Sequence, residues 1–332
     1  MPRLSLDEIE LRVAAALARR GASTVAAASV ARSVRRAEAD DIRAVGLGYL
    51  PTYLSHLVSG KVVGEAVPDV TSPRPATVTV DAMHGFAHPA FDVGLPLLIK
   101  AAQQCGTASM AIRRSYSIGV LGHPVEDLAN AGLVAFAVTN SPPNIAPWGG
   151  RKPLFGTNPI AFAVPRKQGP PLVIDQATSM VTKVALAAAA RQGKALPPDW
   201  ALDAAGQPTT DASAALQGSM LAYGGVKGAN LALIVDLLAA GLTGANFSSD
   251  ASPYAKADGP PPGVGQLVMA FDPAAFASGF LDRVETLVAT MLAQDGVRLP
   301  GDNRLAARAR TALDGVFVDD ALLAACEALP LS

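Results

Sequence analysis

Small polar residues and glycines gather in four short islands in the middle of the chain. The islands span residues 139–142, 149–159, 175–179 and 224–228, and the last places Lys227 between glycines. Turns that offer backbone N–H groups, small hydroxyls and a lysine suit the binding of a phosphate or a ribose. The pattern therefore predicts a nucleotide-like ligand held between strand ends and helix starts.

Asp175 is a candidate ligand residue within these islands. It closes an apolar run that predicts a strand, and Ala177, Thr178 and Ser179 after it predict the start of a helix. A carboxylate beside unpaired N–H groups binds ribose hydroxyls, while the helix start faces a phosphate. The alternative for Asp175 is a plain helix cap, and for Lys227 it is a solvated surface lysine.

The composition is that of an ordered globular protein. Of 332 residues, 50% are hydrophobic and 17% are charged, and the length suggests two domains. A formal net charge of −1 gives no basic surface for nucleic acid or for an anionic membrane. Because Cys105 and Cys326 form neither a disulfide framework nor a metal-ligand set, we expect no metal.

No targeting or membrane segment is expected. Ser5 and Glu8 have the spacing of a capping box, which predicts an amphipathic helix at the very start of the sequence. The most apolar run, residues 229–245, contains Asp236 and several glycines, so it predicts a buried helix. We therefore expect a cytoplasmic protein.

Hydrophobic periodicity and the positions of glycine and proline predict alternating helices and strands. Residues 68–75 are expected to form an extended connection and residues 193–211 a surface loop, while 244–265 is a long excursion of the kind that forms lids or interface arms. Helices are expected at about 6–20, 23–38, 50–59, 90–104, 227–240, 273–293 and 303–329, and strands at 77–81, 109–113, 133–139, 160–165, 172–175 and 266–272. The absence of a Gly-x-Gly-x-x-Gly motif argues against a Rossmann half.

In their order the islands resemble the malate/L-lactate dehydrogenase type 2 family, over about residues 6–308. The resemblance implies an α/β fold with a mixed, largely antiparallel sheet that binds the cofactor and is not a Rossmann domain. It implies a helical domain from both chain ends, residues 1–75 and 298–332, and an NAD(P)H-binding domain, residues 76–297. Family members are homodimers, so we expect a homodimer that binds a small-molecule substrate.

The resemblance also implies which residues contact the cofactor. We expect NADPH, with NADH as the alternative, because Lys183, Arg298 and Arg304 favour the phosphorylated form. The two arginines flank a turn and have a structural salt bridge as their alternative role. The full set comprises Thr157, Asp175, Gln176, Ala177, Thr182, Lys183, Lys227, Arg298, Gly301, Asp302 and Arg304.

Within the family the chain resembles the imine-reducing branch, the Δ1-piperideine-2-carboxylate and Δ1-pyrroline-2-carboxylate reductases. The residues that carry this likeness are 153–157, 241–248 and 298–302, together with the 244–265 excursion. Members of this branch transfer a hydride from NAD(P)H to the C=N carbon of a cyclic imino acid.

The chain departs from the family at the positions of the chemistry. Members carry Ser-His-Gly before a Leu-Pro-x-Tyr element, and the histidine donates a proton; here Ala44-Val45-Gly46 precedes Leu50-Pro51-Thr52-Tyr53. Ser55-His56 follows that element instead of preceding it, so we do not expect it to substitute.

Three further family positions are changed. Tyr49 stands where an arginine grips the substrate carboxylate, Ala185 where an aspartate completes the relay, and Ser117 where many members have a second histidine. Since the cofactor positions are retained, the resemblance implies an altered substrate site on a preserved scaffold.

Few polar residues are available as a replacement acid. Tyr49, Tyr116 and His123 are candidates, as are His84 and His88 beside a turn after the first strand, and a structural histidine is the alternative for each of the three histidines. Arg113 or Arg114 is the candidate for the missing carboxylate grip. The substrate-binding loop is expected at Ser117, Ile118, Gly119, Val120 and Leu121.

The first functional hypothesis is an NAD(P)H-dependent imine reductase for a cyclic or N-substituted imino acid. A ketone reduced by hydride becomes an alkoxide that needs a proton donor, whereas a protonated iminium already carries its proton. One alternative is an oxidoreductase on the same scaffold with a new substrate, such as a 2-oxo acid, a 2-hydroxy acid or a biosynthetic intermediate. The other is a non-redox binding or cyclisation protein.

Overall fold

A seven-stranded sheet forms the centre of the protein in this computed structural model, which describes residues 2–327 except for the side chains of 325–327. Its strand order is β2 (Asp69–Arg74), β3 (Thr77–Asp81), β4 (Thr107–Ser115), β10 (Val264–Phe271), β5 (Val134–Thr139), β6 (Ile160–Val164) and β7 (Leu172–Gln176). Only the β3–β4 pair is parallel among these neighbours. The predicted mixed, largely antiparallel sheet is therefore confirmed.

Helices α4 (Ala87–Cys105) and α5 (Gly122–Asn130) cover one face of this sheet. Strand β4 alternates buried and half-buried residues, and its inward side chains, including Met110 and Ile112, enter the same apolar core as the two helices. This alternation is what a strand with one covered face requires.

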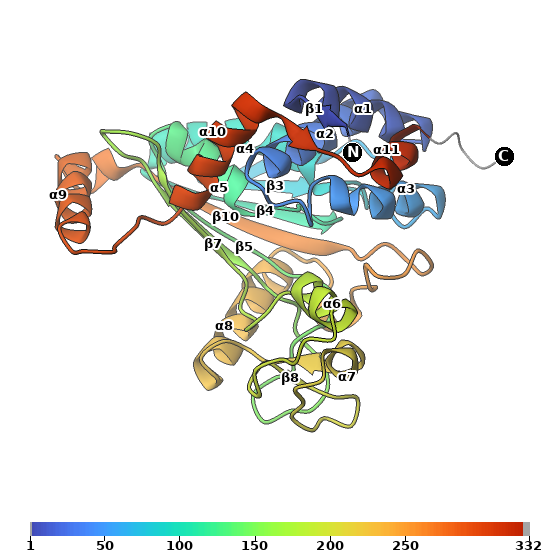
Figure 1. Ribbon diagram of the computed structural model, residues 1–332. Coiled ribbons are helices and arrows are strands. Elements are labelled where there is room, and N and C mark those ends of the chain that lie inside the picture. The colour runs from blue at the N-terminus through green and yellow to red at the C-terminus, as the bar shows by residue number, and fades with distance from the viewer. Residues whose placement is uncertain (1, 328–332) are drawn as a thin grey trace.

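The two chain ends lie together. Strand β1 (Arg3–Leu4) pairs with β11 (Val316–Phe317), and one apolar core joins residues from both ends. Around it lie α1 (Leu6–Arg19), α2 (Thr24–Ala39), α3 (Leu50–Val58), α10 (Asp302–Asp314) and α11 (Asp320–Glu327). Figure 1 shows these blue and red helices gathered on one side of the sheet.

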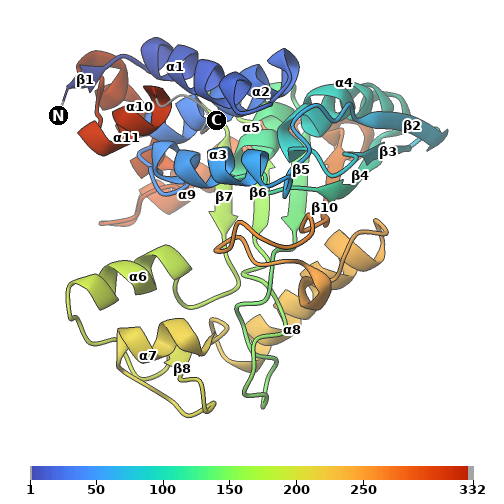
Figure 2. The same ribbon diagram turned by 90° about the vertical axis from the view of Figure 1, so that its right-hand side faces the viewer.

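A separate lobe extends from the opposite side (Figures 1 and 2). It contains α6 (Lys183–Arg191), α7 (Ala212–Gln217), α8 (Val226–Asp236) and the short pair β8 (Ala201–Leu202) and β9 (Ser219–Met220). One turn of π-helix (Leu237–Gly241) continues α8. The lobe has small apolar cores of its own, so the sheet lies between two helical layers.

Several predicted boundaries are wrong. Residues 69–74, expected as a connection, form β2, because an edge strand tolerates Pro73. The helix expected at 177–179 begins at Lys183 instead, where the Thr182 side chain accepts a hydrogen bond from Ala185 N. The helix expected from 273 is α9 (Phe280–Leu292), and β11 divides the predicted C-terminal helix.

Among the described residues, no helix has the length and apolar character needed to cross a membrane.

Candidate active site

Two of the sequence islands pack directly against each other. Thr157 N donates to Ser141 Oγ at 3.1 Å, and the Thr157 carbonyl accepts from both the N–H and the hydroxyl of Thr178 at 2.9 Å. A Cβ on Gly156 would lie 2.3 Å from Ser141, so only glycine fits at this turn. The turns around Thr157 therefore form one compact corner where the sheet meets the separate lobe.

Asp175 binds the start of a different helix from the one expected. Its Oδ2 accepts from Gly122 N, the first residue of α5, at 2.7 Å. A Cβ on Gly122 would lie 3.0 Å from Asp175 Oδ2 and 3.2 Å from Arg304 Nη1. Gly301, at the start of α10, lies against Val173 of the same strand. The N-termini of α5 and α10 thus converge on the end of β7. In the sequence, Gly122 lies 53 positions before Asp175 and Gly301 lies 126 positions after it.

Arg304 extends from this corner into a buried group of charges. Arg308 binds Glu126 through two hydrogen bonds of 2.7 Å and also binds Asp40. Arg304 Nε lies 3.7 Å from Asp40 Oδ2 and is a buried donor with no hydrogen-bond partner among the described residues. His123 Nε2 completes the group at 3.0 Å from Asp40 Oδ2.

The pKa shifts in this ion group follow from its contacts. Burial opposes the charge on Asp40, but the hydrogen bonds from His123 and Arg308 outweigh it, so the pKa of Asp40 is lowered. The pKa of Glu126 is lowered in the same way, chiefly by Arg308 against the effect of burial. Burial lowers the pKa of His123 and favours its neutral form, although Asp40 acts in the opposite direction.

His123 is therefore a structural member of the ion group. It does not lie with Tyr49 and Tyr116, the other two candidate acids. Its imidazole is 4% exposed and is held by Asp40, because the α5 helix directs it toward α2 and α10. This geometry corrects the expectation that it serves as a replacement acid.

The remaining cofactor candidates are spread over exposed turns. Thr182 and Lys183 lie at the start of α6, and Lys227 lies at the start of α8; all three are exposed. Gln176 and Arg298 are exposed, Ala177 is half-buried, and Asp302 accepts from Leu299 N at 2.8 Å. The structure thus brings Asp175, Gly301 and Arg304 together and leaves Lys183 and Lys227 on the separate lobe.

The corner at the end of β7 fits an anionic nucleotide. Two helix N-termini present positive dipole ends there, and the guanidinium of Arg304, whose Nη1 lies near Gly122, adds a positive charge. A carboxylate, Asp175, stands at the same place. Such a donor set is suited to a phosphate with ribose hydroxyls beside it.

Tyr49 and Tyr116 lie together in a group of aromatic rings. Their hydroxyl oxygens are 3.5 Å apart, at the outer limit of a hydrogen bond. Tyr53 and Tyr254 pack edge-on against them, with ring centroids 4.9 Å from Tyr49 and 5.2 Å from Tyr116 respectively. Burial raises the pKa of Tyr49 to about 12 and raises that of Tyr116 further, so both hydroxyls remain protonated at neutral pH.

His56, which the sequence interpretation set aside, is the third polar member of this group. Its Nδ1 lies 2.6 Å from the Tyr116 hydroxyl, and the ring is 2% exposed. The spacing of Tyr49, Tyr53 and His56 is i, i+4, i+7, which places all three on one face of a helix. This helical spacing is the sequence feature that groups His56 with the tyrosines, and the position of the Ser-His-Gly motif does not reveal it.

The long excursion covers the tyrosine group. Tyr254 belongs to it and packs its ring against Tyr116, close to Ser117 of the predicted substrate loop. A fully buried lysine fixes it in place: Lys61 Nζ donates to the carbonyls of Pro253, Lys256 and Asp258 at 2.7, 2.6 and 2.9 Å. The predicted lid or arm is thus tied to the end of α3.

Arg113 and Arg114 are both occupied by one carboxylate. Asp81 accepts from Arg113 Nε at 2.9 Å and from Arg114 Nη2 at 2.7 Å, because the parallel register sets Asp81 beside Arg113. The pKa of Asp81 is lowered because these arginines outweigh the effect of its burial. Both arginines thus bind Asp81, and the role of either one in binding a substrate carboxylate stays a prediction.

The substrate loop has its apolar side chains directed inward. Ile118, Val120 and Leu121 are 7% exposed or less and pack toward the core. Ser117 Oγ accepts from Gly119 N at 3.2 Å, and Gly119 has a φ of +75° that favours glycine. Ser117 and the backbone around Gly119 are therefore the parts of this loop that a ligand can reach.

The altered family positions carry no acid. Ala44 and Val45 are half-buried just before Tyr49, and Ala185 is exposed in the first turn of α6. No group of three or more His, Cys, Asp and Glu side chains within residues 2–327 has the arrangement of a metal site.

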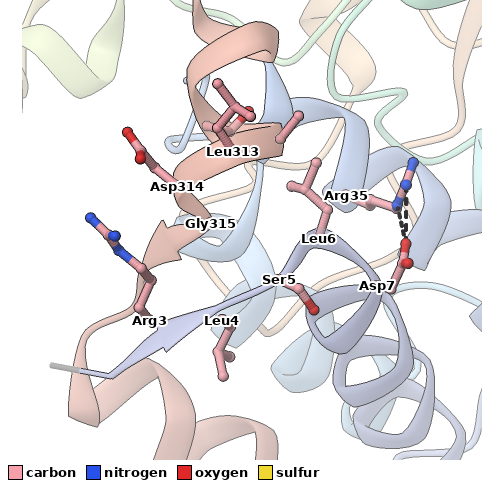
Figure 3. A pocket seen from close by; sticks show the side chains of 11 residues that line it. Arg3, Leu4, Ser5, Leu6, Asp7, Arg35, Leu313, Asp314 and Gly315 are labelled. Atoms are coloured by element: carbon pink, nitrogen blue, oxygen red, sulfur yellow. Dashed lines mark hydrogen bonds and ion pairs between the residues drawn. The ribbon is translucent and has the colours of Figure 1, made fainter.

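Two hollows lie outside this arrangement. One, of about 450 Å³, lies between β1 and the end of α10, with the Arg35–Asp7 ion pair at its edge (Figure 3). The other, of about 200 Å³, lies behind the substrate loop and is lined by His88, His123, Ile118 and Val120 among others. Burial lowers the pKa of His88 to about 4.

The sequence profile described as malate/L-lactate dehydrogenase matches residues 4–327. The chain is 47% identical over 305 residues to a (2R)-3-sulfolactate dehydrogenase (NADP(+)) of Chromohalobacter salexigens, covering 92% of this chain and 91% of the relative. It is 42% identical to Δ1-pyrroline-2-carboxylate reductase 1 of Burkholderia ambifaria, over 96% of this chain and 95% of that protein.

Solved structures have the same fold. The Δ1-piperideine-2-carboxylate reductase of Pseudomonas syringae pv. tomato superimposes with a TM-score of 0.94 at 39% identity, covering 98% of this chain and 99% of that one. The agreement extends over the sheet, the helical layer and the separate lobe alike.

Proposed function

Because the chain belongs to the malate/L-lactate dehydrogenase family, we propose that it is an NAD(P)H-dependent oxidoreductase that reduces the C=N bond of a cyclic imino acid. Relatives named for Δ1-pyrroline-2-carboxylate and Δ1-piperideine-2-carboxylate reduction support this substrate class. The cofactor supplies the hydride when it is bound.

The observation that carries the proposal is that, among the described residues, the polar groups around the predicted substrate loop are poor acids at neutral pH; burial lowers the pKa of the neighbouring His88 to about 4. Val45 and Ala185 cannot donate a proton, and burial raises the pKa of Tyr49 to about 12. A general acid works best when its pKa is near the working pH, so Tyr49 is poorly suited to protonate an alkoxide. A protonated iminium needs no such donor, since it becomes a neutral amine on accepting a hydride.

The cofactor residues are proposed from the corner at the end of β7. Asp175 is placed to hold ribose hydroxyls, and Arg304 with the N-termini of α5 and α10 to hold a phosphate. Lys183, Lys227 and Arg298 are proposed as further positive charges for the phosphates of the cofactor. The charge balance favours NADPH.

A second candidate is the oxidation of a 2-hydroxy acid with NADP⁺. The observation that favours it is the 47% identity to a (2R)-3-sulfolactate dehydrogenase. It requires that a proton acceptor or donor other than the family histidine serves the hydroxyl group.

The test is an assay of NADPH oxidation with Δ1-piperideine-2-carboxylate, Δ1-pyrroline-2-carboxylate and pyruvate between about pH 5 and pH 9, with (2R)-3-sulfolactate and NADP⁺ in parallel. Turnover of the imines, falling as pH rises above the pKa of the imine itself, with negligible turnover of pyruvate, is expected. Equal rates with pyruvate, or turnover of sulfolactate alone, would contradict imine reduction. NADPH that neither binds nor changes its fluorescence would instead indicate a non-redox protein.

A further inference from the structure

Three polar groups form a chain that leads from the end of α3 to Tyr49. His56 Nδ1 lies 2.6 Å from the Tyr116 hydroxyl oxygen, and that oxygen lies 3.5 Å from the hydroxyl of Tyr49. Tyr116 is fully buried, whereas Tyr49 is only partly buried and follows shortly after the altered positions Ala44 and Val45. The chain therefore has a buried end at His56 and an accessible end at Tyr49.

The tautomer of His56 follows from its surroundings. Nδ1 is directed at the Tyr116 hydroxyl, and the carbonyl of Lys256, which can only accept a hydrogen bond, lies close to the imidazole. The same carbonyl accepts from Lys61 Nζ at 2.6 Å, so its position is fixed by a buried ammonium group. This arrangement favours a proton on Nε2, which leaves Nδ1 as an acceptor.

The charge state of His56 agrees with this assignment. Burial lowers the pKa of His56, and the ammonium of Lys61 lowers it further, while the contact with Lys256 opposes both. The imidazole is neutral at neutral pH, so a proton on both ring nitrogens is disfavoured.

The direction of the remaining hydrogen bonds follows. Tyr116 has one hydroxyl proton, and at 2.6 Å it donates that proton to His56 Nδ1. Toward Tyr49 the Tyr116 oxygen can only accept, so the Tyr49 hydroxyl donates inward. A lone pair of the Tyr49 oxygen is then left on the accessible side. The hydroxyl that replaces the family arginine therefore presents an acceptor.

Given the proposed imine reduction, on which this inference rests, we propose that the Tyr49 oxygen accepts a hydrogen bond from the N–H of the iminium and thereby selects a ring nitrogen that carries a proton. A 2-oxo acid offers only lone pairs at the corresponding atom and meets the Tyr49 lone pair unfavourably. When the hydride adds to the iminium carbon, the C=N π electrons become the nitrogen lone pair and the N–H proton stays in place. Tyr49 is a substrate-contacting residue in this scheme, and Tyr116, His56 and Lys61 are positioning residues.

A pair of planar ligands tests the acceptor directly and without turnover. Pyrrole-2-carboxylate and furan-2-carboxylate have nearly the same shape, but the ring atom beside the carboxylate is an N–H donor in one and an oxygen acceptor in the other. In the presence of NADPH, wild-type protein is expected to bind the pyrrole about tenfold more tightly. Equal affinities in the wild-type protein would overturn the inference.

Substitutions along the chain separate recognition from packing. Tyr49→Phe removes the acceptor and is expected to abolish the difference between the two ligands, and Tyr116→Phe frees the Tyr49 proton and is expected to reduce it. Tyr53→Phe removes a hydroxyl from the same ring cluster and should keep the full preference. His56→Asn retains an acceptor near the Nδ1 position and should preserve it, whereas His56→Leu should not. An unchanged preference in both Tyr49→Phe and Tyr116→Phe would overturn the inference.

Nitrogen NMR of ¹⁵N-histidine-labelled protein supplies an independent readout if the leucine variant does not fold. His56 is expected to show an unprotonated Nδ1 and a protonated Nε2, and a protonated Nδ1 would overturn the inference. The two proposals fail differently. Preference for the pyrrole without reduction of either imine would reject imine reduction and support the acceptor role of Tyr49. Imine turnover without a preference between the two ligands would support imine reduction and reject the acceptor role.

Discussion

Arg308 of α10 and Glu126 of α5 form a two-pronged ion pair, with Nη1–Oε1 and Nη2–Oε2 distances of 2.7 Å each. Glu126 is 4% exposed in its side chain, and Asp40 of the same group is fully buried. This pair joins a helix from the C-terminal part of the chain to a helix that covers the sheet.

Replacing Arg308 with methionine is expected to lower the free energy of unfolding by about 3–5 kcal/mol, because it leaves two buried carboxylates without their main partner. Urea denaturation at neutral pH measures the change. Arg310→Met is the control on the same helix, since Arg310 is 62% exposed and lies 4.0 Å from Asp41. Similar small effects in both variants would show that the ion group does not stabilise the fold.

His88 predicts a dependence of stability on pH. Burial lowers its pKa from 6.5 to about 4, so the unfolded chain takes up a proton at a higher pH than the folded one. The stability is therefore complete above about pH 6.5 and is lost as the pH falls toward about 4, by about 3 kcal/mol in all. Comparing wild type with His88→Asn over this range isolates the contribution, and parallel curves for the two proteins would exclude His88.

Lys227→Ala is expected to weaken NADPH binding by about tenfold, because an ammonium at a helix start attracts a phosphate. Fluorescence titration of NADPH gives the affinity. Lys194→Ala, an exposed lysine on the same lobe, is the matched control. If Lys227→Ala and wild type bind NADPH equally, Lys227 does not belong to the cofactor site.

Restoring the family residues should restore the missing chemistry. The double variant Ala44→Ser, Val45→His is expected to gain reduction of 2-oxo acids by about 10²-fold, since a positioned general acid contributes at least that much. The gain should decline above about pH 6.5, where an unperturbed histidine loses its proton. Ala44→Ser, Val45→Asn adds polarity without a titrating group, and an equal gain in that variant would exclude acid catalysis by the new histidine.

The apolar surface of α8 predicts a homodimer. Leu233 and Ile234 of α8, Leu237 of the π-helical turn and Leu242 just after it are between 43% and 65% exposed. An exposed apolar surface of this kind is typical of an interface, so we expect a second copy of the chain to cover it. Light scattering should give twice the monomer mass for wild type and the monomer mass for Ile234→Asp. Leu11→Asp, on exposed α1, should remain dimeric, and a monomeric wild type would contradict the prediction.

The sheet could be predicted because its strands are short apolar runs between glycines and prolines. Residues 77–81, 160–164 and 172–176 read as strands almost to the residue. The hydrogen-bond partners of the site residues could not be predicted, since these partners come from segments that are distant in the sequence. Asp175 was correctly placed at a strand end, but its partner Gly122 lies 53 positions away.

The same reason explains two contacts of the site that the sequence does not predict. Asp81 and Arg113 meet only through the register of a parallel strand pair, which periodicity does not determine. His56 and Tyr116 are 60 positions apart, so a motif on one side of α3 does not reveal their contact. Helical spacing within 49–56 carried the correct information.

The attachment of the 244–265 excursion by Lys61 has a consequence for its motion. Three carbonyls share one buried ammonium group. Moving any part of residues 253–258 away therefore exposes the charge of Lys61 and also disturbs the hydrogen bonds of the other two carbonyls. Gradual fraying is therefore disfavoured, and the segment should open in a single cooperative step. Amide hydrogen exchange in this stretch would then follow one common opening equilibrium, and the face of Tyr116 that packs against Tyr254 would be uncovered in the same step.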